Sequence, residues 1–224
     1  MLRFSKTLLV LFGLGMVTAS RAQTSVRLFS SHLLGQRTFE IAAGVFDARG
    51  TSDARPVFET SVNLPLRRGW DLGIGCAHYA FRDHIGAFVD EGRDQALFAT
   101  ATGFVNAGKT KPFFAAGLGY EWTKNELSYG GTRLFRSRDS DVTWRTSLGV
   151  EIPFSRVTIT PSLSYRDSFR GDFFRIRRAC LTVGLDAHFW ITKSFGSVAS
   201  VTFIDSRETS YQAWTYLLGA RIRF

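Results

Sequence analysis

Hydrophobic and polar residues alternate along the chain, most clearly from Trp214 to Phe224. Every second side chain in this stretch is apolar or aromatic, whereas the positions between them include Thr215, Gly219 and Arg221. Successive side chains of a strand point to opposite faces, so the pattern predicts a strand with one apolar and one polar face. The aromatic residues lie near both ends of the apolar face. This arrangement suits a strand with lipid outside and a polar space inside.

Similar stretches recur at regular spacing, with lengths near the roughly 9 to 11 residues that cross a bilayer at a tilt. We expect ten strands, with eight or twelve as alternatives, because a single-chain barrel with both ends on one side needs an even number. The predicted strands are 37–47, 56–64, 70–81, 95–105, 112–122, 141–152, 157–166, 178–189, 195–204 and 212–224.

Short and long connections alternate between these strands. The short ones are 65–69, 106–111, 153–156 and 190–194, and the mostly longer ones are 48–55, 82–94, 123–140, 167–177 and 205–211. This asymmetry is typical of periplasmic turns and outer loops. The sequence therefore predicts one all-β domain, a closed antiparallel transmembrane β-barrel over 37–224. Residues 23–36 alternate weakly and form either a periplasmic lead-in or an irregular first strand.

Gly219, Ile222 and the terminal Phe224 carry a family resemblance. Their spacing resembles the closing strand of bacterial outer-membrane β-barrels, which the barrel-assembly machinery recognises; Leu217 departs from the polar residue that the family prefers there. By its strand pattern, nearly the whole chain after the leader resembles the opacity-protein and OmpA/OmpX-like superfamily. The resemblance implies a monomeric protein of the Gram-negative outer membrane. Roles in this superfamily include surface adhesion, envelope integrity and narrow conductance.

The first residues have the features of an export signal. Arg3 and Lys6 precede an apolar run from Thr7 to Ala19, and small residues at Ser20 and Ala22 predict cleavage after Ala22. We therefore expect residues 1–22 to be a signal peptide. The formal net charge is +9, and three of the cations lie in the leader, which leaves +6. Export makes lipopolysaccharide phosphates the expected polyanion, rather than nucleic acid.

A soluble lipocalin-like barrel or a sandwich is the alternative fold, with the apolar faces turned inward. Small residues such as Gly73, Gly75 and Gly117 on the polar faces favour the narrow inside of a membrane barrel instead. Aromatic residues at strand ends predict two girdles. The expected girdle includes Trp122, Trp144, Tyr165 and Trp214 at the outer edge and Trp70 and Phe189 at the inner edge. On the fourth strand we place Phe98, Thr100, Thr102 and Phe104 toward lipid, with the opposite phase open.

The same alternation assigns charges of both signs to the lumen. They are Glu40, Glu59, Asp71, Glu121, Glu151, Asp186, Arg145, Arg166, Arg178, Arg221 and Arg223. Mixed signs indicate internal pairing, and thus a plugged or very narrow lumen. We expect Glu40 to pair with Arg221 or Arg223 across the barrel closure, and Glu121 to pair with Arg145. The alternative is that these charges solvate a wet lumen.

Residues that could support catalysis, metal binding or a disulfide are few. Cys76 and Cys180 fall on opposite faces and have no zinc-type spacing, so we expect no disulfide, metal or cofactor. A rim enzyme would have Asp83, His84 and His78 as candidates. The sequence fixes no nucleophile or oxyanion donor near them. We therefore predict no catalytic residues.

Arginines gather in two predicted outer loops, and their forked guanidinium groups suit phosphate. Possible lipopolysaccharide contacts are Arg133, Arg136, Arg138, Arg170, Arg175 and Arg177. Charged loops that are merely solvated are the alternative. The favoured function is a structural or surface-interaction role, through envelope integrity, adhesion or lipopolysaccharide contact. A small porin-like channel is the second hypothesis, and an enzyme acting on lipid A or peptides is the third.

Overall fold

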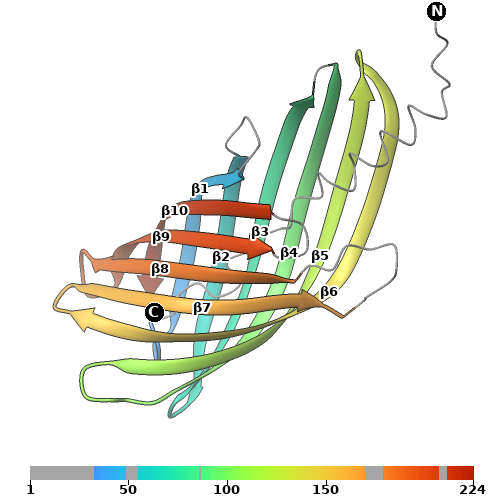
Figure 1. Cartoon of the computed structure of the whole chain (residues 1–224). Coiled ribbons are helices and arrows are strands. Elements are labelled where there is room, and N and C mark those ends of the chain that lie inside the picture. The colour runs from blue at the N-terminus through green and yellow to red at the C-terminus, as the bar shows by residue number, and fades with distance from the viewer. Residues whose placement is uncertain (1–32, 49–54, 86, 170–178, 207–210) are drawn as a thin grey trace, which may run out of the picture.

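The protein is a closed barrel of ten antiparallel strands, seen in a computed structural model that describes residues 33–48, 55–85, 87–169, 179–206 and 211–224. Each strand pairs with its neighbours in chain order, and β1 pairs with β10 (Figure 1). The strands are β1 Thr38–Ala48, β2 Arg55–Arg67, β3 Trp70–Ile85, β4 Phe88–Phe104, β5 Lys111–Tyr129, β6 Thr132–Phe154, β7 Val157–Ser168, β8 Cys180–Trp190, β9 Phe195–Ser206 and β10 Tyr211–Arg223. The all-β barrel and its ten strands are confirmed. The predicted signal peptide lies outside the described residues. Among the described residues, no helix is long and apolar enough to span a membrane.

The alternation of each strand separates an apolar outside from a polar lumen. On β10, Leu218 is 72% exposed whereas Thr215 is 1% exposed. Large apolar side chains on other strands, such as Ile41 and Leu118, also face outward and are exposed. Glu40, Asp71 and Arg166 are instead buried inside. The apolar faces therefore look outward, which excludes the soluble barrel and sandwich alternatives.

The barrel closes where β1 meets β10, and Gly219 allows the two backbones to approach. Gly219 is the register partner of Ala42. A Cβ added at Gly219 would lie 2.4 Å from the carbonyl oxygen of Ile41 and 2.9 Å from the Cα of Ala42. No real Cβ tolerates such distances from backbone atoms, so any larger residue would shift β1.

Strands β3 to β6 run beyond the ends of the other strands and form a wall above one side of the barrel (Figure 1). The sequence analysis predicted loops at 82–94 and 123–140, and both predictions are wrong because these residues continue the strands. Ile85 pairs with Phe88, and Tyr129 pairs with Thr132, so each predicted loop is a strand hairpin with a tight turn. Beyond its pair with Ser168, β6 has no partner strand on that side among the described residues.

The expected phase of the fourth strand was also wrong. Phe98, Thr100 and Thr102 on β4 are buried in the lumen, and Leu97 faces outward. The reason lies on β3, because Phe98 is the register partner of Gly75. A Cβ on Gly75 would lie 2.4 Å from the Phe98 ring, so the glycine provides the space that this ring fills.

Candidate functional site

Glu40 and Arg221 form an ion pair across the strands that close the barrel. The two residues are register partners on β1 and β10, both side chains are buried, and Arg221 Nη2 donates to Glu40 Oε2. The expected alternative partner, Arg223, instead stacks on Trp190 of β8, with its guanidinium carbon 4.2 Å from the ring centroid. Of the two arginines expected to pair with Glu40, the structure therefore brings Arg221 to it.

A second charged cluster lies in the outer half of the lumen. Arg166 Nη2 of β7 donates to Glu121 Oε2 of β5 at 2.6 Å, and Thr143 Oγ1 donates to the other oxygen of the same carboxylate at 3.0 Å. Arg145, the expected partner of Glu121, is buried and lies in register beside Arg166. Glu121 thus belongs to a cluster with two arginines.

The contact between Glu121 and Arg166 was missed in the sequence. It joins two strands that are separated by β6, and it depends on how far the strands are staggered around the barrel. Alternation alone identifies the lumen face of each strand. It gives no measure of stagger, so it predicts contacts only between neighbouring strands.

Residues Leu33–Gln36 plug the mouth of the lumen at the end with the short turns, which the sequence predicts to be periplasmic. Leu33 and Leu34 are buried. The backbone N–H of Leu34 donates to Glu151 Oε2 at 2.8 Å, and the N–H of Gly35 donates to Asp71 Oδ2 at 2.7 Å. The plug is thus tied to β6 and β3.

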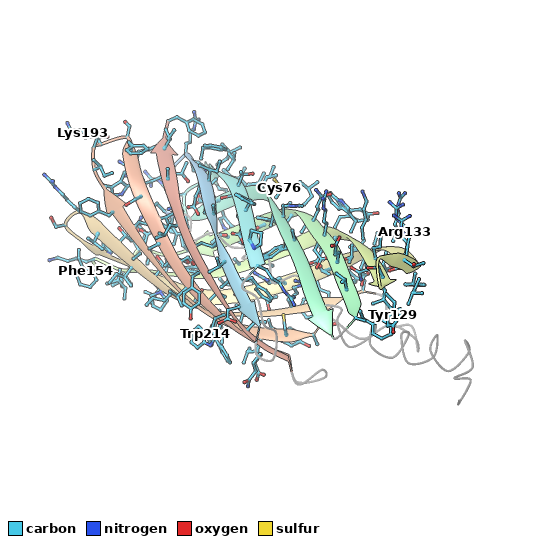
Figure 2. All side chains as sticks on the ribbon, turned by 90° about the horizontal axis from the view of Figure 1, so that it is seen from above. Cys76, Tyr129, Arg133, Phe154, Lys193 and Trp214 are labelled. Atoms are coloured by element: carbon cyan, nitrogen blue, oxygen red, sulfur yellow. The ribbon has the colours of Figure 1, made fainter. Side chains whose placement is uncertain are left out.

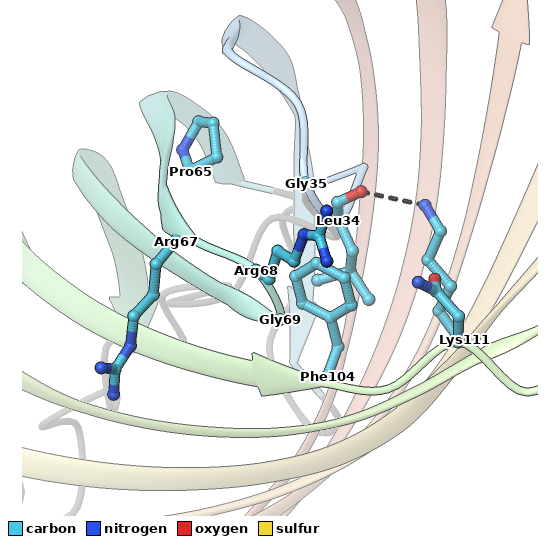
Figure 3. Close-up of a pocket in the computed structure, with 9 residues that line it drawn as sticks. Leu34, Gly35, Pro65, Arg67, Arg68, Gly69, Phe104 and Lys111 are labelled. Atoms are coloured by element: carbon cyan, nitrogen blue, oxygen red, sulfur yellow. Dashed lines mark hydrogen bonds between the residues drawn. The ribbon is translucent and has the colours of Figure 1, made fainter.

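Two further donors hold the carbonyl groups of this plug. Lys111 Nζ of β5 donates to the Leu34 carbonyl at 2.9 Å and also pairs with Glu151 at 2.9 Å (Figure 3). The side-chain amide of Asn63 on β2 donates to the Gln36 carbonyl at 3.0 Å. Four strands therefore bind one short segment. The predicted lead-in over 23–36 gave no sign of this, because its alternation is weak and its described part adopts a turn.

A cavity of about 590 Å³ lies beside the plug at the same mouth. Leu34, Phe104, Arg67, Arg68 and Lys111 line it together with parts of the two nearby turns (Figure 3).

Apolar side chains fill the lumen toward its outer end. Phe46, Val57, Cys180 and Ile204 are buried there in one cluster. Phe46 meets Tyr79 edge to face, with ring centroids 6.1 Å apart, and the Tyr79 hydroxyl donates to Glu59 at 3.3 Å. The lumen therefore holds a plug at one end, an apolar cluster at the other, and buried charges between them.

The predicted girdle residues all lie on the outward face. Trp144 and Tyr165 pack together with ring centroids 5.5 Å apart, as do Phe203 and Trp214 at 4.9 Å. Trp122 donates from its indole N–H to Gln95. The inner set includes Trp70 and Phe189, both exposed.

The residues of the expected assembly signal lie at the end of β10. Ile222 and Phe224 face outward and are exposed, and Gly219 faces the lumen at the closure. Recognition of this strand by the assembly machinery stays a prediction.

The residues considered for chemistry at the outer rim are spread along strands. Arg133, Arg136 and Arg138 are exposed on β6 rather than in a loop, and Arg133 pairs with Glu126 at 2.7 Å. Arg170, Arg175, Arg177 and Arg178 lie outside the described residues. Asp83 and His84 belong to β3, and His78 on the same strand points outward.

The cysteines occupy opposite faces, as expected. Cys76 is exposed on the outside and Cys180 is buried in the lumen, and both are free thiols. Within the described part of the chain, no three histidine, cysteine or acidic residues gather as a metal site.

Neither a protein-family model nor a curated protein matches the sequence. The structure resembles the transport unit of the autotransporter AIDA-I from Escherichia coli, with a TM-score of 0.58 and 10% identity over 95% of this chain and 97% of that chain. It also resembles the translocator domain of the autotransporter NalP from Neisseria meningitidis, with a TM-score of 0.54 and 12% identity over 98% and 97%. Neisserial surface protein A matches with a TM-score of 0.42 and 12% identity over 84% and 97%.

The two autotransporter domains are outer-membrane β-barrels. At such identities the likeness concerns the fold, and the fold of this chain is that of the bacterial outer-membrane β-barrels. The family resemblance expected from the strand pattern is confirmed at this level, and the outer-membrane location is supported.

Proposed function

We propose that this protein acts in the bacterial outer membrane as a closed barrel, through its outward surface and outer wall rather than through transport. The filled lumen is the observation that carries this proposal. Asp71, Glu121, Arg166 and Ile204 are buried to 1% exposure or less, although each points toward the barrel axis. A barrel slightly wider than the eight-strand type has little room beyond its side chains.

The nature of the buried groups supports a permanent closure. Removing one partner of a buried ion pair destabilises a protein by about 3–5 kcal/mol, because the remaining charge is left buried without compensation. Glu40 with Arg221 and Glu121 with Arg166 are both of this kind. A lumen that opened for solutes would have to break or hydrate these contacts in each cycle.

Planar-bilayer recording tests the closed lumen. The refolded whole protein should give no resolved current steps, and the variant Arg145→Ala should also be silent. Regular steps from the native protein would overturn the closed lumen. Heat-dependent migration on a detergent gel should accompany the silent recording, since it shows that the barrel is folded.

A small channel is the second candidate, and the cavity at the periplasmic mouth favours it. This cavity of about 590 Å³ is lined by Arg67 and Arg68, both exposed, and by Lys111, whose charge Glu151 compensates; the two arginines would attract anions. Anion-selective steps that disappear on Arg67→Gln and Arg68→Gln together would support this second function.

The partners follow from the same location. We propose contacts with outer-membrane lipid and lipopolysaccharide, with recognition of Gly219, Ile222 and Phe224 by the assembly machinery during biogenesis. We propose no catalytic residues among the described side chains.

A further inference from the structure

Three cations form one row across the outward face of the wall. Arg93 of β4 is the register partner of Lys124 on β5, and Lys124 is the register partner of Arg138 on β6. All three side chains are exposed. Register partners on one face have Cβ atoms about 5 Å apart, so the three positive charges lie side by side.

Like charges directly opposite each other destabilise a sheet. Among the side chains that the structure describes, Arg93, Lys124 and Arg138 make no ion pair. The carboxylates of the next row are Glu91 and Glu126, and Glu126 pairs with Arg133. The row thus retains three positive charges that an external anion would neutralise.

The order of rows along this face locates the cations relative to the bilayer. The apolar row holds Leu97, Tyr120 and Val142, all exposed. The next row outward holds Gln95, Trp122 and Ser140, and the cationic row follows it. Rows on one face are two residues apart, or roughly 7 Å.

A tryptophan at this position marks the membrane–water interface. The cationic row therefore lies one row beyond the tryptophan, roughly 7 Å along the tilted strands, on the outward face at the level of the lipid headgroups. Tyr129 and Arg133 mark the outer end of this wall, opposite Lys193 and Phe154 (Figure 2). A ligand at this height on the lipid-facing side is the headgroup of an outer-leaflet lipid.

We propose that Arg93, Lys124 and Arg138 form a binding site for the phosphate groups of lipid A. Two guanidinium groups and one ammonium group offer forked and single donors, and phosphate oxygens accept both. Arg136, exposed in the next row, extends the site away from the membrane. This inference rests on the proposed lipopolysaccharide contact in the outer membrane, and it adds the chemical groups that are bound and the residues that bind them.

Native mass spectrometry of the whole refolded protein in detergent tests the site. The probes are bisphosphorylated lipid A, dephosphorylated lipid A and inorganic tripolyphosphate. The test variant carries Arg93→Gln, Lys124→Gln and Arg138→Gln. We expect it to bind bisphosphorylated lipid A at least tenfold more weakly than the native protein. Dephosphorylated lipid A should bind the native protein as weakly as bisphosphorylated lipid A binds the test variant.

A matched control removes three exposed cations in the turns at the opposite end of the barrel, through Lys109→Gln, Arg156→Gln and Lys193→Gln. Its lipid A affinity should stay within twofold of the native value. A charge-preserving variant, Arg93→Lys with Arg138→Lys, should keep most of the binding. It separates loss of the site from failure to fold.

Three results would overturn the site. They are equal lipid A binding by the test variant, equal loss in the control, and displacement of lipid A by equimolar tripolyphosphate, which would indicate a general phosphate site. The proposed location is read separately from heat-dependent migration and bilayer insertion of the control variant. A barrel that inserts but binds lipid A without this row would therefore refute only the site.

Discussion

Glu40 and Arg221 compensate each other's charge inside the lumen, where both side chains are buried away from water. Removing one partner of a buried ion pair leaves a charge without compensation, at a cost of about 3–5 kcal/mol. Arg221→Met should lower the free energy of unfolding by that amount, and Glu40→Gln added to it should restore part of the loss. Urea unfolding in lipid vesicles, followed by tryptophan fluorescence, measures both variants. A double variant no more stable than Arg221→Met would contradict the pairing.

Gly219 has a geometric role at the closure that is separate from recognition during assembly. A Cβ there would collide with the backbone of Ile41 and Ala42. Gly219→Ala should therefore destabilise the barrel by about 1–3 kcal/mol, the usual cost of overpacking.

Refolding into detergent without any assembly factor isolates this geometry. The fraction of heat-modifiable protein should fall for Gly219→Ala. It should not change for Ala220→Val, a matched change at the next residue, whose side chain faces lipid. Equal folding of both variants would show that the close approach is unimportant.

The plug is an element of a few residues that Glu151 and Asp71 hold by separate bonds. A hydrogen bond to a charged group contributes about 1.5–3 kcal/mol, and 1.4 kcal/mol changes an equilibrium tenfold. Glu151→Ala should therefore speed exchange of the Leu34 amide hydrogen by about tenfold or more. Asp71→Ala should act in the same way on Gly35. NMR of the protein in micelles reads both amides, and unchanged protection at either would contradict the plug.

At this scale the sequence predicted the existence of every strand, because one face of each meets lipid and the other meets the lumen. It could not predict the length of β5 and β6. The outward face of the wall carries charged side chains such as Lys124 and Arg138, so residues 123–140 lack hydrophobic alternation. The phase of β4 failed for a different reason, since Phe98 enters the lumen only because Gly75 on the next strand leaves space for its ring.

The sequence predicts on which strand face each residue of the candidate site lies, but not its position along the barrel axis. Alternation placed Glu121, Arg145 and Arg166 in the lumen, where the structure has them. The contact of Glu121 with Arg166 depends on strand stagger, which no local pattern records. The plug depends on long-range bonds from Leu34 to Glu151 and Lys111, and these become visible only when the barrel closes.

The whole molecule is inverted relative to a soluble barrel, with an apolar outside and a filled polar lumen. Its two native cysteines report on both properties. Cys76 lies on the outside, with its thiol 3.0 Å from the Thr60 hydroxyl, and Cys180 lies in the apolar cluster at the outer end of the lumen. No substitution is needed to use them as probes.

Maleimide labelling of the folded protein in lipid vesicles tests this inverted, closed barrel most directly. A lipid-soluble maleimide should modify Cys76 and leave Cys180 unmodified, and a charged, water-soluble maleimide should modify neither until urea unfolds the chain. Mass spectrometry of the peptides identifies the modified residue. Rapid modification of Cys180 by the water-soluble reagent in the folded protein would contradict the account, because that thiol would then face water.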